Sequence, residues 1–311
     1  MVNTLPALPE GIQAVEPVQA APPAGDGRPL CAFTVDVEDW YQSSVDFDAP
    51  ISERVLVNMD RLLAVLDDCG VKGTFFVQGM VAEAYPQLVR RIADEGHEIQ
   101  SHGYSHRPLF GMDRAALRRE LDYGRKTVED AAGVRLTAFR APDFSILRGN
   151  LWALEALVEA GFDVDSSIFA IRTRRYGIAD WEVGPHYVTL AGGARILEVP
   201  VAVWTAGRVR LPVAGGGYFR LLPHPLLARA LRGILNDRRP VIVYCHPYEF
   251  NPQEMAAYRG RVSTRFYLSQ SMGRGTFARK VRYLLGHLPF GRFDAVMAAW
   301  GLSANGHAAP G

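Results

Sequence analysis

Short apolar runs alternate with longer segments of helical periodicity between residues 31 and 285. The runs CAFTVD at 31–36 and VIVYC at 241–245 predict buried strands. Apolar residues from Val55 to Leu66 keep one helical face, and Gly70 is placed to end that helix. We expect further strands at 73–77, 97–100, 137–139 and 162–164, and further helices at 86–95, 113–132, 151–160, 226–236 and 276–285.

This alternation predicts parallel strands joined by right-handed crossovers. A (β/α) barrel, complete or incomplete, and a doubly wound open sheet both fit the length of the chain. The stretch 170–222 breaks the pattern with several Gly and Pro and short β-like pieces. Residues 1–28 and 301–311 lack either period and are expected to be loose tails, the first of them disordered. Because the first 28 residues have no basic start and no unbroken apolar core, we expect no signal peptide and a cytoplasmic location.

Composition narrows the possibilities. The chain has 311 residues, 48% of them hydrophobic, and a net charge of +1, which is ordinary for a globular enzyme and points to no nucleic-acid partner. No apolar run approaches the roughly 18 residues that cross a bilayer. The three cysteines are widely spaced without a CxxC pair, which argues against a redox motif or a thiolate zinc site.

Polar side chains follow five of the expected strands, at the point where each strand ends. Parallel strands share one rim at their carboxyl ends, and active sites of α/β proteins are built there. Five strands agreeing is a stronger signal than any single motif. The residues are Asp36, Glu38 and Asp39 after the first strand, His102 and His106, Arg140, Asp165, and His246.

The HxxxH spacing of His102 and His106 would place both imidazoles on one side of a helical turn, as two metal ligands require. The alternative is a pair of surface or capping histidines. In a strand Asp36 and Glu38 point to the same side, so one could bind metal while the other acts as a base. Asp39 would point elsewhere unless the chain turns there; a solvated acidic loop is the alternative for all three.

His246 is a candidate general acid, with the buried carboxylate of Asp165 available to fix its tautomer and raise its pKa. A purely structural histidine is the alternative. Arg140 could hold the base carboxylate, or be an ordinary surface arginine. The run Gly215–Gly217 lacks the context of a phosphate loop and instead predicts a tight turn or a close backbone approach. Eight basic residues and no acid lie between 255 and 292, which suits either a membrane-surface or anionic-polymer patch or a solvated helix face.

The motifs TVDVEDW, SHGYSH, FRAP, VDSS and YCHP, in that order, resemble the five motifs of the polysaccharide deacetylase family (NodB homology domain, carbohydrate esterase family 4). The segments GGGYFRLLP and VIVYCHPYEF look like the subgroup encoded with bacterial exopolysaccharide and exosortase loci. The resemblance covers about residues 30 to 295. It implies an α/β fold of the distorted (β/α) barrel type, with one domain over 29–300 that includes a subgroup-specific extension from about residue 200.

The resemblance also implies roles. Asp36 matches the base, and Arg140 the arginine that holds it. Asp165 resembles the acid that tunes the catalytic histidine, and His246 resembles that histidine. The first motif departs from the family's adjacent aspartates, which leaves Glu38 as third metal ligand beside His102 and His106, with Asp39 in reserve. The resemblance also suggests substrate contacts at Pro142 and Asp143, with the backbone N–H near Asp143 as oxyanion donor. Trp40, Tyr41, Trp181 and Tyr218 could stack on sugar rings; packing in the core is the alternative and the commoner fate of such residues.

The expected reaction is hydrolysis of an N-acetyl group on an amino sugar of a bacterial polysaccharide or its lipid-linked precursor, at the inner face of the membrane. Imidazole and carboxylate ligands suit Zn, and also Co, Ni or Mn. Two alternatives stay open. One is an allantoinase-like C–N hydrolase acting on a small cyclic amide, and the other is a non-catalytic module that binds glycan.

Overall fold

The computed structural model describes residues 9–18, 29–171, 173, 176–207 and 209–303. The strands are β1 (Ile12–Pro17), β2 (Cys31–Val37), β3 (Thr74–Val77), β4 (Glu98–Ser101), β5 (Ala138–Phe139), β6 (Val164–Asp165), β7 (His186–Leu190), β8 (Arg195–Glu198), β9 (Val203–Ala206), β10 (Val209–Pro212), β11 (Val241–Cys245) and β12 (Phe290–Gly291). The helices are α1 (Trp40–Ser44), α2 (Arg54–Asp68), α3 (Gly79–Ala84), α4 (Pro86–Asp94), α5 (Arg114–Ala132), α6 (Ala153–Glu159), α7 (Gly216–Leu221), α8 (His224–Asn236), α9 (Thr264–Ser271), α10 (Arg274–Leu285) and α11 (Phe293–Ala299).

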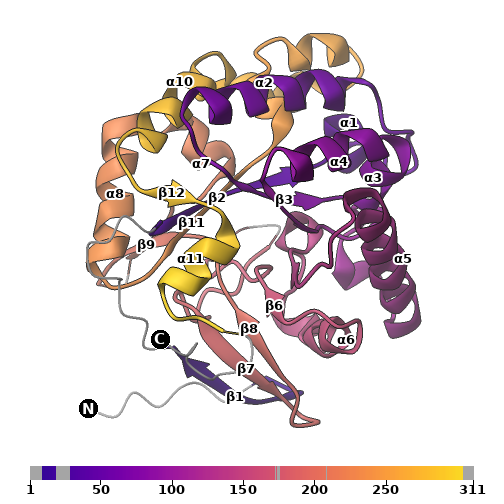
Figure 1. Cartoon of the computed structure of the whole chain (residues 1–311), viewed down its shortest axis with the longest axis vertical. Helices are drawn as coiled ribbons and strands as arrows, with labels where there is room; N and C mark the ends of the chain where they lie inside the picture. Colours follow the sequence, from indigo (N-terminus) through magenta and orange to yellow (C-terminus); the bar gives the residue numbers. More distant parts are fainter. Residues whose placement is uncertain (1–8, 19–28, 172, 174–175, 208, 304–311) are drawn as a thin grey trace.

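The main sheet has the strand order β1-β7-β8-β6-β5-β4-β3-β2-β11, and β12 also pairs with β2. Every pair from β8 to β11 is parallel, whereas β7 is antiparallel to both β8 and β1. Helices α2, α3, α4, α5 and α10 flank the parallel strands, as Figure 1 shows. All seven residues of β2 are buried, because neighbours cover both of its faces.

The gap between β8 and β11 is bridged by chain without regular pairing. The Ala202 N–H donates to the Ile242 carbonyl (2.8 Å), and the Tyr244 N–H donates to the Ala214 carbonyl (2.9 Å). The chain that leaves β8 therefore passes beside β11 and continues the barrel wall between these two strands. The expected distorted (β/α) barrel is confirmed. None of the described helices is long and apolar enough to span a membrane.

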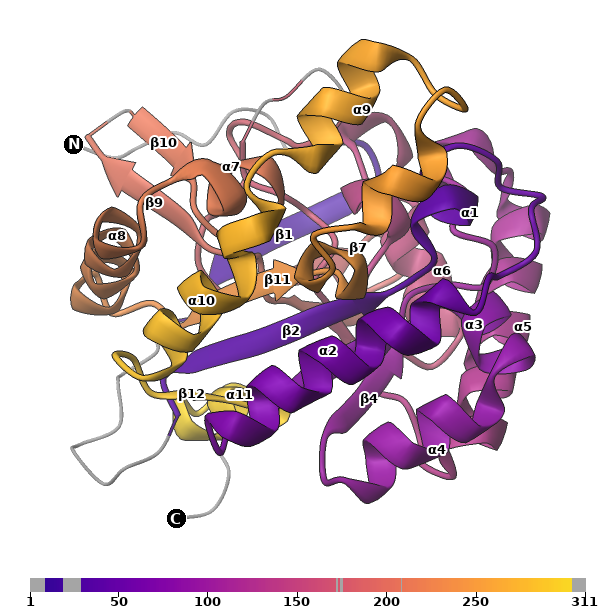
Figure 2. The same ribbon diagram turned by 90° about the horizontal axis from the view of Figure 1, so that it is seen from above.

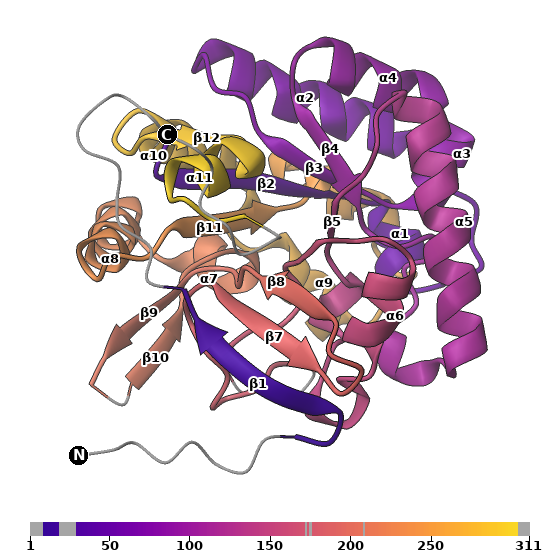
Figure 3. The same ribbon diagram turned by 60° about the horizontal axis from the view of Figure 1, so that its bottom comes forward.

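The N-terminal region differs from expectation. The prediction of a disordered tail over 1–28 is wrong for Ile12–Pro17, which pairs with β7 at the edge of the sheet in Figure 3. The rest of that tail, apart from the residues next to β1, lies outside the described residues, as does 304–311 of the C-terminal tail. The segment 170–222 contains β7 to β10 and α7, in keeping with its expected short β pieces.

The expected close backbone approach at Gly215 is confirmed. A Cβ at this position would collide with the carbonyl oxygen and ring of Tyr244 in β11. Only glycine allows the chain to enter α7 this close to the strand. As a result α7 lies against the carboxyl end of β11, where Gly216 and Gly217 line the same cavity as the polar residues described next.

Candidate active site

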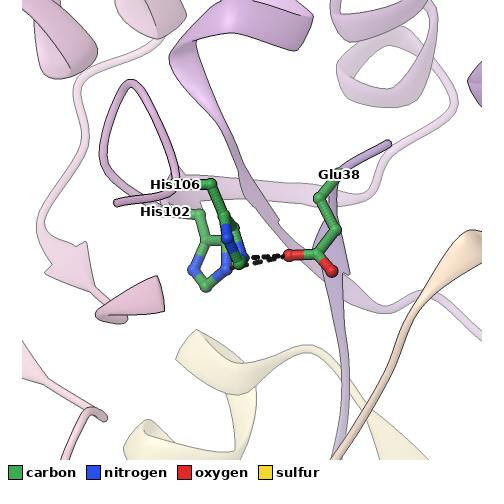
Figure 4. Close-up of side chains that lie close together, drawn as sticks. All are labelled: Glu38, His102 and His106. Carbon is green, nitrogen blue, oxygen red and sulfur yellow. Dashed lines mark ion pairs between the residues drawn. The ribbon is translucent and has the colours of Figure 1, made fainter. Parts of the chain in front are cut away.

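Three of the predicted ligands meet at the carboxyl ends of β2 and β4. Glu38 follows β2, and His102 and His106 follow β4. Figure 4 shows both imidazoles directed at the Glu38 carboxylate. His102 Nε2 lies 3.5 Å from Glu38 Oε2, and His106 Nε2 contacts the same oxygen. One ligand atom from each residue lies within 4.8 Å of the others, and all three residues are buried.

Neighbouring groups orient these three ligands. Glu38 Oε1 accepts hydrogen bonds from the Tyr248 hydroxyl (2.8 Å) and the Ser43 hydroxyl (3.1 Å). His102 Nδ1 lies 2.8 Å from the Arg140 carbonyl, which places the proton on Nδ1 and turns the Nε2 lone pair toward Glu38.

The remaining carboxylate oxygen, Glu38 Oε2, is buried, and no donor other than the two imidazole nitrogens lies against it among the described residues. A cation bound between these three atoms would satisfy all of them at once. Two imidazole nitrogens and one carboxylate oxygen are the protein ligand set of a catalytic zinc site with an open position. The residues present therefore fit a divalent cation.

The same three side chains are electrostatically coupled. Burial opposes ionisation of Glu38, but the His106 and His246 imidazoles outweigh it and hold the pKa of Glu38 well below its usual value. Burial likewise opposes protonation of His106, yet the Glu38 carboxylate raises the pKa of that imidazole. A negative charge thus persists at the centre of the group, as a cation site requires.

A helical turn does not bring the two histidines together; that expectation is wrong. Residues 102–106 form a loop between β4 and α5, and His106 has a positive φ of 62°. Glu120 of α5 fixes the loop, because its Oε1 accepts the backbone N–H groups of Tyr104 (2.9 Å) and Ser105 (2.6 Å). The loop conformation, rather than helical periodicity, aims both imidazoles at Glu38.

Asp36 and Arg140 form a buried ion pair beside this group. Arg140 Nη1 donates to Asp36 Oδ1 and to Thr34 Oγ1, both at 2.7 Å, and Nη2 donates to Ser166 Oγ at 3.2 Å. The guanidinium lies over the Phe76 ring, 4.1 Å from its centroid. Five donors in a rigid plane allow such multiple contacts, so the arginine holds the carboxylate in one orientation.

His246 faces the metal group from the end of β11. Its Nε2 lies 3.9 Å from Glu38 Oε1, and its Nδ1 lies 3.2 Å from Glu249 Oε2. The ring stacks on Tyr248 at 4.9 Å with an interplanar angle of 6°. Burial opposes protonation, but the Glu38 and Glu249 carboxylates outweigh it and raise the pKa of His246 to about 9.

The predicted partner of His246, Asp165, is replaced by Glu249. Glu249 is fully buried, and Arg220 Nη1 of α7 donates to its Oε1 at 2.6 Å. Burial would raise the pKa of Glu249, but His246 and Arg220 lower it to about 2. The carboxylate three residues after His246 also accepts that residue's backbone N–H (3.0 Å), so the local turn delivers it to the imidazole.

Asp165 belongs to a different pair. The Ser167 hydroxyl donates to its carboxylate, and the neighbouring carboxyl is that of Glu198 in β8. Burial raises the pKa of Asp165, and burial together with the Asp165 charge raises that of Glu198 well above its usual value. Asp165 is thus engaged with Ser167 and Glu198, and no contact joins it to His246 among the described residues.

Asp39 is not a reserve ligand. It is the N-cap of α1, where its Oδ1 accepts the backbone N–H groups of Tyr41 (2.9 Å) and Gln42 (3.1 Å). Its Oδ2 accepts the Ser52 N–H at 3.2 Å. Both oxygens are engaged, because the chain turns into a helix directly after β2 and an N-cap carboxylate satisfies the first N–H groups.

The site opens into a cavity of about 180 Å³. Asp143, on the expected substrate-binding turn, lines it and has a positive φ of 54°, whereas Pro142 is buried and does not line it. The aromatic walls are Phe144, Tyr176, Tyr244 and Tyr248, and the other lining residues include Asp36, Glu38, His102, His106, Arg220 and His246.

Trp40 and Tyr41 are not among the residues that line this cavity, and their contacts match the alternative of core packing. The Trp40 side chain is buried, and its ring packs against Tyr258 at 4.6 Å and Phe266 at 5.7 Å. Tyr41 stacks on Tyr258 at 5.5 Å. The C-terminal part of the chain covers α1 and takes up both rings in a small separate core.

The sequence reading missed Glu249, Tyr248 and Arg220, which together orient His246 and Glu38. The sequence did offer a signal for Glu249, because this carboxylate follows His246 by three residues in the motif HPYE. For Arg220 there was none, because it comes from α7 and meets Glu249 only through the fold.

Two parts of the chain match known family models. Residues 47–163 match the model of the polysaccharide deacetylase family, and residues 166–298 match a domain of unknown function (DUF3473). Residues 47–163 therefore resemble a polysaccharide deacetylase domain. The resemblance drawn from the motifs is confirmed, and the deacetylase match contains His102, His106 and Arg140. His246 and Glu249 lie in the second match, so both segments contribute to one site.

Curated relatives match part of this chain. A peptidoglycan-N-acetylglucosamine deacetylase of Bacillus cereus is 36% identical over 96 residues, which are 30% of this chain and 35% of that protein. A peptidoglycan deacetylase of Helicobacter pylori is 31% identical over 152 residues, 45% of this chain and 49% of that protein. The chain thus spans between about a third and a half of these relatives.

Two solved structures match nearly the whole chain. A candidate polysaccharide deacetylase from Mycobacterium smegmatis is 28% identical with a TM-score of 0.54, covering 86% of this chain and 96% of that one. An allantoinase (PuuE) has a TM-score of 0.60 at 14% identity, covering 93% of this chain and 95% of that one. At that identity the allantoinase shares the fold alone.

Proposed function

We propose that this chain is a metal-dependent hydrolase that removes N-acetyl groups from amino sugars of a bacterial polysaccharide or its lipid-linked precursor. The observation that carries the proposal is the convergence of three groups on one cavity. Glu38, His102 and His106 can hold a cation, and Asp36 of the Asp36–Arg140 pair and His246 of the His246–Glu249 pair line the same cavity. Relatives named as deacetylases of peptidoglycan and of chito-oligosaccharides support the substrate class.

Zn is the proposed ion, and Co, Ni or Mn suit the same ligands. When bound, such an ion supplies Lewis-acid polarisation of the acetamide carbonyl and a lower pKa for the attacking water. The ligand set requires deprotonated side chains. Glu38 meets that requirement because its pKa is depressed, and the contact of His102 Nδ1 with the Arg140 carbonyl leaves Nε2 as the nitrogen that faces the ion.

The residues of the chain divide the proton transfers between them. Asp36, oriented by Arg140, accepts a proton from water while the water oxygen attacks the acetamide carbon. The backbone N–H beside Asp143 is the proposed donor to the oxyanion. His246, protonated through its neighbours, gives its proton to the departing nitrogen as the C–N bond breaks. The products are acetate and the free amine of the sugar.

The test is acetate release from N-acetylated glycans by the purified chain, stripped with a chelator and reloaded with each metal. The substrates are chito-oligosaccharides, peptidoglycan fragments and allantoin. We expect acetate from a glycan only after reloading, and strong loss of turnover in Asp36→Asn and His246→Ala. Ureide hydrolysis without acetate release, or full turnover in Asp36→Asn, would contradict the proposal.

A further inference from the structure

Exposed apolar side chains concentrate in the C-terminal part of the chain. The described residues include twelve large hydrophobic side chains that are exposed, and seven of them lie between residues 209 and 272. Single exposed apolar residues are common on soluble proteins, but a grouping needs an explanation. These seven are 46% to 58% exposed: Val209, Leu211, Tyr218, Leu221, Leu226, Leu268 and Met272.

The elements that carry these side chains are adjacent. A Cβ at Gly273, between α9 and α10, would lie 2.9 Å from the Arg220 carbonyl in α7. Lys280 of α10 donates to the Phe219 carbonyl of α7 at 2.8 Å. Figure 2 shows α7 between the β9–β10 hairpin and the α9–α10 segment. Leu221 and Met272, each next to one of the contacting residues, therefore belong to one surface.

The same part of the chain is strongly basic. Residues 199–311 contain 15 Lys and Arg but 4 Asp and Glu, whereas residues 1–198 contain 19 and 29. The stretches 199–236 and 255–292 have no acidic residue. Arg229 of α8, Arg265 of α9 and Arg279 of α10 are exposed, and none forms an ion pair with a residue that the structure describes. Positive charge that is not neutralised within the protein is available to an anionic partner.

This surface also borders the cavity. Gly216, Gly217 and Arg220 of α7 and Gln270 of α9 line the space above the candidate metal site. The exposed side chains of Tyr218, Leu221 and Leu268 lie within two positions of these lining residues. A partner that covers the surface would therefore lie at the entrance to the active site.

We propose that this surface, formed by α7, α9 and the adjoining exposed residues of α8 and α10, binds a bilayer of anionic phospholipids. Basic residues interleaved with leucine, methionine and tyrosine are the composition of proteins that lie at a membrane interface. An acidic soluble glycan would engage the arginines but leave the apolar side chains in water. The consequence that the pocket then acts on glycan held at the membrane rests on the proposed function; the binding itself does not.

The test is co-sedimentation of the full chain with vesicles, without substrate. We expect binding to vesicles of phosphatidylcholine mixed with phosphatidylglycerol, little binding to phosphatidylcholine alone, and weakening by salt. Each arginine near an anionic surface contributes about a factor of five in affinity, so the double variant Arg265→Glu and Arg279→Glu is expected to bind at least about 25-fold more weakly. Leu268→Gln with Met272→Gln should also weaken binding, because its apolar contact is lost.

The matched control carries Arg119→Glu and Val134→Ser, an exposed arginine and an exposed apolar residue in and after α5. It should bind like the wild type, and thermal melts should show that every variant is folded. Acetate release from a soluble oligosaccharide should be unchanged in all of them, which separates this proposal from the proposed activity. Absence of vesicle binding would overturn the inference. So would equal binding by the charge-reversed variant, or binding of acidic polysaccharide that is unaffected by the Leu268 and Met272 changes with no binding of vesicles.

Discussion

Replacing Glu249 by glutamine tests which carboxylate governs His246. The substitution keeps an acceptor near Nδ1 but removes a unit charge 3.2 Å from it. The Coulomb energy of that pair is about 5 kcal/mol at an effective dielectric constant of about 20. The imidazole is partly exposed, which weakens the interaction further. A fall of about one to two pKa units is the expected result, in line with measured effects of an opposite charge.

The direction in which the pH profile moves follows from the role of His246. A general acid acts in its protonated form, so turnover is present below its pKa and is lost as pH rises through it. Because Glu249 raises that pKa, Glu249→Gln moves the alkaline limb of the kcat/KM profile to lower pH. At the pH where half of the wild-type histidines are protonated, a fall of one to two units leaves about a tenth to a hundredth protonated, which lowers turnover about 5- to 50-fold.

The assay is acetate release across pH for the wild type, Glu249→Gln and the matched control Asp165→Asn. The control also changes a buried carboxyl, at the end of β6, but one paired with Ser167 and Glu198 rather than with the histidine. It is expected to leave the alkaline limb in place. The assignment of Glu249 as the carboxylate that governs His246 would be refuted if the alkaline limb of the profile did not move in Glu249→Gln. It would also be refuted if Asp165→Asn moved that limb instead.

Three further substitutions test the supporting contacts. Arg140→Met leaves the buried Asp36 carboxylate without its cation, so we expect a loss of about 3–5 kcal/mol in the free energy of unfolding by urea, together with loss of turnover. Tyr248→Phe removes the hydroxyl that donates to Glu38, so calorimetry should show zinc bound about 10-fold more weakly or worse, with unchanged stoichiometry. Gly215→Ala forces a Cβ onto a carbonyl of β11, so thermal melting should show a loss of about 1–3 kcal/mol. Unchanged stability in the first and third, or unchanged affinity in the second, would count against the corresponding contact.

The fold and the rim were largely predictable from local patterns. Fully apolar runs such as 31–36 and 241–245 reveal strands buried on both faces, and their parallel order determines where Asp36, His102 and His246 gather. The strand at Ile12–Pro17 was not predictable, since it is short and amphipathic and its pairing partner β7 lies far along the chain.

Which residues contact one another within the site was harder to predict than which residues lie there. Asp165 and Glu249 both follow the appropriate strands in sequence, and only the turn after β11 together with Arg220 selects Glu249. From the local sequence alone, Trp40 and Tyr41 look like aromatic residues that stack on sugar rings. In the structure they are covered by residues that lie more than 200 positions further along the chain. Choices of this kind depend on contacts between distant segments, which periodicity does not encode.

The most direct measurement of the central claim is the number of zinc ions that the chelator-stripped chain binds in isothermal titration. The wild type should bind a single ion tightly, and Asp39→Asn should do the same, because that carboxylate only caps α1. Glu38→Gln and His102→Ala should lose the tight site while remaining folded by circular dichroism. Tight binding retained in both of these variants, or lost in Asp39→Asn alone, would contradict a metal centre built from Glu38, His102 and His106.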